Sequence, residues 1–170
     1  MRAPTQITLL IVLVAALAAT ASAAPDFVIR RDTDIGGFTL TRDGTLKGAI
    51  DAFGSPSNRQ GGYDTCTVTW INYGIQSEFA GSFGVPCDSR GRHSETTISQ
   101  RQWRTDKGLR IGDPLKRLRQ LYPKAKRYIG KNWALLSRPF GGTRVPTLLA
   151  TIKTGRITAF IVRSPWLLTG

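Results

Sequence analysis

The spacing of apolar residues predicts two short helices, one in each half of the chain. The first is predicted from Thr45 to Phe53, with Asp43 or Thr45 as its cap. Its apolar residues recur at intervals of three and four and so share one face: Leu46, Ala49, Ile50 and Phe53. The second is predicted after Asp113, a good N-cap, with Pro114 at the first helical position. Its buried stripe consists of Leu115, Leu118 and Tyr122.

After each helix the apolar period changes to two, which is the period of a strand. From Thr65 onward Cys66, Val68 and Trp70 alternate with threonines, as a half-buried strand requires. Further strands are predicted at 75–79, 93–104 and 133–137, with a final hairpin formed by 147–153 and 156–163. The pattern therefore predicts an α+β fold, an antiparallel sheet with the short helices packed on one face.

Two stretches of the sequence are similar to each other, 37–56 and 108–123. Each begins with glycine and hydrophobic residues, continues through a turn that contains aspartate into a helix-period stretch, and ends at a proline. A unit that cannot bury its apolar face alone must pack against its copy. We therefore expect two tandem helix-plus-three-strand repeats, at 35–104 and 105–165, after a loose N-terminus at 25–34 and before a tail at 166–170.

The first 24 residues have the features of a signal peptide. Arg2 precedes an apolar run at 7–18, and Ala21-Ser22-Ala23 gives the small residues at which signal peptidase cuts. The run is shorter than the roughly 20 residues of a spanning helix, and no cysteine follows the cut that could carry a lipid. The mature chain is expected to be secreted or associated with the cell envelope, with no transmembrane segment.

The two cysteines agree with export, because an oxidising compartment lets a pair form a disulfide. Cys66 and Cys87 are predicted to form one, since metal binding or redox chemistry would need a close-spaced partner cysteine or more than one histidine.

The formal net charge of the precursor is +13, and the positive charge is concentrated. Between Arg101 and Lys131 eleven basic residues stand against two acidic ones. Such a field favours anionic lipids, acidic polymers or an acidic protein face, and a basic surface that is only solvated is the alternative. The basic binding face is predicted to consist of Arg110, Lys116, Arg117, Arg119, Lys124, Lys126 and Arg127. Nucleic acid is not the expected partner, because the helical phase buries Tyr122 among these residues.

Groups that could carry catalysis are few. His93 is the single histidine, and its loop-like surroundings predict an exposed side chain rather than a general base. Metal-ligating clusters and phosphate-binding or dinucleotide-binding glycine motifs are missing from the sequence, so no metal, cofactor or enzymatic activity is expected. Three tryptophans are expected in the core: Trp70, Trp103 and Trp133. Tyr73 and Phe140, in turns, are candidate contact residues, and a packing role is the alternative for both.

The duplicated pattern, with Leu46 to Phe53, then Gly54-Ser55-Pro56 and strands that carry Cys66 and Trp70, resembles the repeat of beta-lactamase-inhibitor-like proteins. It is also similar to the small lipoproteins of the outer-membrane assembly machinery. The resemblance implies a sheet that docks another macromolecule without catalysis. It transfers no site, because the chain lacks the lipidated cysteine of the lipoproteins and the second disulfide of the two-repeat inhibitors.

Two functions are left open by the sequence. The first is a secreted, non-enzymatic module that docks an anionic envelope polymer or lipid surface through the basic face. The alternative is a secreted protein that binds or inhibits another protein through its sheet and loops.

Overall fold

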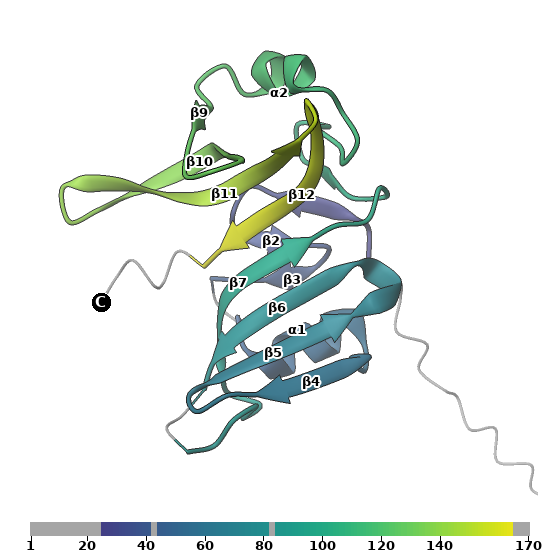
Figure 1. The fold of residues 1–170 in the computed structure, drawn as a ribbon. Coiled ribbons are helices and arrows are strands. Elements are labelled where there is room, and N and C mark those ends of the chain that lie inside the picture. Colours follow the sequence, from purple (N-terminus) through teal and green to yellow (C-terminus); the bar gives the residue numbers. More distant parts are fainter. Residues whose placement is uncertain (1–24, 42–43, 82–83, 165–170) are drawn as a thin grey trace, which may run out of the picture.

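The computed structural model describes residues 25–41, 44–81 and 84–164, which form two sheets and two α-helices (Figure 1). The larger sheet has eight strands in the order β4-β5-β6-β7-β12-β11-β10-β9, and all of its neighbouring strands are antiparallel. Its strands are β4 (Asn58–Gly61), β5 (Thr65–Trp70), β6 (Ile75–Ala80), β7 (Arg92–Ile98), β9 (Lys126–Arg127), β10 (Asn132–Phe140), β11 (Thr143–Lys153) and β12 (Arg156–Arg163). The predicted α+β class and antiparallel pairing are confirmed.

The alternation predicted from Thr65 is confirmed in β5, where Cys66, Val68 and Trp70 are buried. A short 3-10 helix, η1 (Ile71–Tyr73), connects β5 to β6.

A second sheet of four short strands is built mainly from the N-terminal segment. Its order is β3-β2-β1-β8, with β1 (Val28–Arg30), β2 (Asp34–Ile35), β3 (Phe38–Thr39) and β8 (Arg104–Thr105). The prediction of a loose segment at 25–34 is wrong, because β1 pairs on both sides and both Ile29 and Asp32 are buried. Strands of two or three residues are too short to give a readable period.

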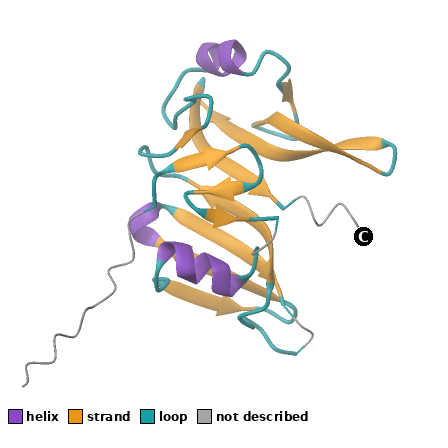
Figure 2. Cartoon of the chain, turned by 180° about the vertical axis from the view of Figure 1, so that it is seen from behind, coloured by secondary structure: helices purple, strands orange, loops and turns teal. Residues whose placement is uncertain are grey.

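Helix α1 (Leu46–Phe53) lies within the predicted range. The hydroxyl of Thr45 accepts a hydrogen bond from the backbone amide three residues later, at 3.1 Å, which is the N-cap arrangement. Asp43, the other predicted cap, lies outside the described residues. The ring of Phe53 packs edge-on against Phe38 of β3, 5.9 Å between centroids. Figure 2 shows α1 from the side opposite to Figure 1.

Helix α2 (Leu115–Leu121) begins one residue later than predicted, after Pro114. Asp113 does not cap it, because its carboxylate accepts a hydrogen bond from the backbone amide of Arg110 at 2.8 Å. The first amide of α2 donates instead to the carbonyl of Gly155, in the turn between β11 and β12. The prediction that both helices pack on one face of the sheet is therefore wrong. Helix α2 lies at the end of the β11–β12 hairpin, apart from α1 (Figure 1).

The disulfide predicted between Cys66 and Cys87 is confirmed, with a sulfur–sulfur distance of 1.99 Å. It ties β5 to the loop between β6 and β7. Trp70 and Trp103 are buried as predicted, whereas Trp133 is only partly buried. Within the described residues, no helix combines the length and apolar character that a membrane span needs.

Strands β10 and β11 extend beyond the rest of the sheet. Strand β12 pairs with β11 from Leu148 to Lys153, so the part of the hairpin from Ser137 to Pro146 pairs only with itself. This part forms an arm that projects from the molecule (Figure 1). Phe140, near its tip, is 38% exposed.

Candidate functional site

A groove of about 850 Å³ opens between the segment that follows α2 and strands β10 and β11. Five cationic side chains line it: Lys107, Lys124, Lys126, Arg127 and Arg144. None of the described residues that line the groove is acidic. In the described part of the chain, none of the five cations forms an ion pair with a carboxylate. The charged side chains among the described residues that line the groove are therefore all cationic.

Apolar side chains also line the groove: Tyr122, Pro123, Leu135, Leu136 and Pro146. Tyr122 is 3% exposed, and burial raises the pKa of its hydroxyl to about 12, so it stays protonated at neutral pH. The ammonium nitrogen of Lys107 lies 4.8 Å from the centre of the Tyr122 ring, a cation–π contact that holds the charge over this surface.

Local pairing explains how the groove is assembled. Lys126 and Arg127 form the short β9, which pairs with Ala134 and Trp133 of β10. Arg144 reaches the same groove because the β10–β11 hairpin folds back on itself, and its guanidinium donates to the carbonyl of Ser137 at 2.7 Å. Residues far apart in the sequence are thus brought together at one surface.

All seven residues predicted as the basic face are exposed, but only three of them line the groove. Lys124, Lys126 and Arg127 line the groove. The other four lie outside its lining, on α2 or in the turn before it: Arg110, Lys116, Arg117 and Arg119. The guanidinium of Arg119 lies 5.2 Å from the centre of the Trp133 ring and covers that partly buried side chain.

Sequence reasoning missed two groove residues, Lys107 and Arg144. Lys107 was visible as part of the basic cluster between Arg101 and Lys131. Nothing in the sequence around Arg144 indicated a place in the groove, because the pairing of Arg144 with Pro139 across the β10–β11 hairpin brings it there.

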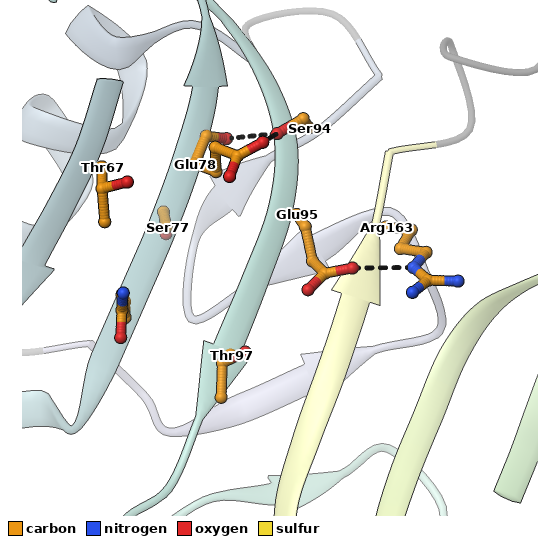
Figure 3. A pocket seen from close by; sticks show the side chains of 8 residues that line it. Thr67, Ser77, Glu78, Ser94, Glu95, Thr97 and Arg163 are labelled. Carbon is orange, nitrogen blue, oxygen red and sulfur yellow. Dashed lines mark hydrogen bonds and ion pairs between the residues drawn. The ribbon is translucent and has the colours of Figure 1, made fainter. Parts of the chain in front are cut away.

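A second hollow, of about 370 Å³, lies on the larger sheet and is lined by polar side chains (Figure 3). Glu78 and Glu95 are directly opposed on β6 and β7. The guanidinium of Arg163 donates to Glu95 at 2.7 Å, and the hydroxyl of Ser94 donates to Glu78 at 3.1 Å (Figure 3). Both carboxylates therefore have hydrogen-bond partners.

The prediction that His93 is exposed is wrong, because its side chain is fully buried in β7. Its Nδ1 lies 2.5 Å from the hydroxyl of Ser164 and its Nε2 lies 2.7 Å from the hydroxyl of Thr96, which in turn lies 2.7 Å from that of Ser77. Burial lowers the pKa of His93 to about 3, so the ring is neutral near pH 7. A ring enclosed in this way cannot meet a substrate, and the network is structural.

The two aromatic residues that were candidate contact residues, Tyr73 and Phe140, differ in their surroundings. Tyr73 is partly buried and packs against Phe27 and Phe53, which is the packing role that the sequence left open for it. Phe140 remains on the surface near the tip of the β10–β11 arm. In the described ranges, no three histidine, cysteine or acidic side chains gather where they could hold a metal ion.

Comparisons with known proteins add little about function. No protein-family model matches the chain, and no curated protein matches it. A solved structure to which the chain is similar is that of an extracellular protein containing a SCP domain from Bacillus anthracis strain Ames, with a TM-score of 0.43 and 13% sequence identity. The match covers 75% of this chain and 45% of that chain, so this chain spans less than half of that protein's length. Similarity at this level assigns no function.

Proposed function

We propose that this chain is an exported, non-enzymatic binding module that holds an anionic component of the cell envelope in the groove beside α2. The observation that carries the proposal is the set of five cations that line one groove without an ion-paired carboxylate among the described residues. Unpaired charges of one sign in a concave surface strengthen the local field and attract ligands of the opposite sign.

Export is part of the same proposal. The Cys66–Cys87 disulfide is of the kind that persists in oxidising compartments, and the predicted signal peptide lies outside the described residues. The ligand would therefore be an anionic polymer or lipid surface encountered in or beyond the envelope.

We also propose that the two halves of the chain are copies of one unit, in line with the resemblance to beta-lactamase-inhibitor-like repeats. After α1, strands β5, β6 and β7 follow as consecutive antiparallel neighbours, and after α2 strands β10, β11 and β12 do the same. The two sets join through β7 and β12. The groove belongs to the second unit.

The proposal is tested by binding of the mature protein to a soluble polyanion, inorganic polyphosphate, at several salt concentrations. If roughly four to five phosphates are neutralised, the affinity is expected to fall by about fifty- to a hundredfold between about 50 mM and about 200 mM salt, because bound cations are released from the polymer. Fluorescence or calorimetric titration gives the affinity at each concentration. Binding that does not depend on salt would overturn the proposal.

A protein partner is the second candidate, and the projecting β10–β11 arm favours it. A partly exposed aromatic near the tip of a hairpin, here Phe140, is a common anchor at protein interfaces. Such a complex would tolerate salt and depend on Phe140 rather than on the groove cations.

A further inference from the structure

The turn between β9 and β10 presents an apolar side chain to solvent. Ile129 is 72% exposed, and its neighbour Tyr128 is 36% exposed. The turn is closed by backbone hydrogen bonds from Tyr128 to Asn132 at 2.8 Å and from Asn132 back to Ile129 at 3.3 Å. Gly130 adopts a φ of +65°, which favours glycine. The backbone therefore holds Ile129 outward.

Single exposed apolar residues are ordinary on protein surfaces, so the surroundings decide what this one means. Lys126, Arg127 and Tyr128 line the cationic groove, and Ile129 is the next residue in the chain. Lys131, on the other side of the turn, is also exposed. The most exposed apolar side chain of the turn thus belongs to the residue that directly follows three groove-lining residues in the chain.

We propose that this turn docks the protein on an anionic lipid bilayer, with Ile129 and Tyr128 in the interface and the groove cations on the headgroups. Apolar and aromatic side chains gain free energy in the interfacial region, and nearby lysines and arginines are attracted to anionic headgroups. A soluble polyanion would satisfy the cations but offer no apolar region to Ile129. This inference rests on the proposed anion-binding function and names the lipid surface as the partner.

The test compares two isoleucines that are exposed to a similar extent. Ile71, in η1, is 66% exposed and lies outside the groove lining, so Ile71→Ser is the matched control for Ile129→Ser. Each full mature protein is titrated with vesicles of phosphatidylcholine containing phosphatidylglycerol, with pure phosphatidylcholine vesicles and with polyphosphate. Both sites are exposed, so both variants should keep the thermal midpoint of the parent protein.

We expect Ile129→Ser to bind anionic vesicles about five- to tenfold more weakly than the parent protein, because the apolar contribution of the isoleucine is lost. Ile71→Ser should bind them as the parent does. Both variants should bind polyphosphate normally, and pure phosphatidylcholine should retain none of the proteins.

Two results would overturn the docking inference. One is unchanged vesicle binding by Ile129→Ser. The other is an equal loss of vesicle and polyphosphate binding, which would mean that the substitution damaged the groove. Failure of the parent protein to bind either polyphosphate or anionic vesicles is a different result and would overturn the proposed function itself.

Discussion

Lowering the pH from 7 to 5 is expected to reduce the free energy of unfolding by about 2 kcal/mol, because of the buried His93. The folded ring has a pKa of about 3, while the unfolded chain has the ordinary value near 6.5. Below pH 6.5 the unfolded state therefore binds a proton that the folded state does not. The loss begins near pH 6.5 and grows to roughly 4 kcal/mol at pH 3, whereas stability above pH 6.5 is unaffected by this group.

Urea denaturation between pH 7 and pH 5 measures this loss. Because His93 is the single histidine, its ring resonance can be followed without ambiguity, and it should not titrate near pH 6.5 in the folded protein. His93→Gln should be less stable at pH 7 but nearly insensitive to pH down to 5, since glutamine cannot take up a proton. Equal stability of the parent protein at pH 7 and pH 5, with a ring that titrates near 6.5, would contradict the buried assignment.

Arg138→Ala is expected to cost about 2 kcal/mol, less than the roughly 3–5 kcal/mol of a fully buried ion pair, because the Arg138 side chain is 41% exposed. The guanidinium of Arg138 donates two hydrogen bonds to Asp32, at 2.6 and 2.9 Å, and the side chain of Asp32 is only 5% exposed. Burial opposes ionisation of this carboxyl, but the hydrogen bonds from Arg138 prevail and lower its pKa. The substitution would leave a buried carboxylate without its partner. The pair also connects the N-terminal sheet to β10. Its loss should therefore weaken the packing between the two.

The exposed ion pair between Lys47 and Asp51 is the matched control, because its side chains are 70% and 61% exposed. Lys47→Ala should cost less than about 1 kcal/mol, as exposed pairs contribute little. Chemical denaturation of both variants at pH 7 makes the comparison. If Arg138→Ala costs no more than Lys47→Ala, the pair does not hold the two sheets together.

The parts of the fold that were predictable have a clear periodicity or a local capping signal. Helix α1 and strand β5 follow their apolar periods, and the turn at Thr154 and Gly155 separates two readable strands. The N-terminal sheet was missed because its strands span only two or three residues and its stability depends on distant contacts such as Asp32 with Arg138. The burial of His93 was missed for the same reason, since Ser164 lies 71 positions away in the sequence.

The candidate site was predictable only in part. The charge cluster identified Lys124, Lys126 and Arg127, because neighbours in sequence that carry charge remain neighbours on the surface. It could not separate them from Lys116 and Arg117 on α2, since that division depends on how the β10–β11 hairpin folds back. The groove is a property of the tertiary structure, and the charge run is a property of the sequence.

The central claim is that the groove, rather than the overall positive charge, binds the anion. Two triple charge reversals test it: Lys124, Lys126 and Arg127 changed to Glu in one variant, and Arg110, Lys116 and Arg117 changed to Glu in the other. Both lower the net charge equally, and the measurement is the dissociation constant for polyphosphate at about 100 mM salt, where charges more than about 10 Å from the ligand are screened. The account predicts a loss of at least about a hundredfold for the groove variant and only a few-fold for the other, at about 1 kcal/mol per contacting cation. An equal loss in the two variants would contradict it.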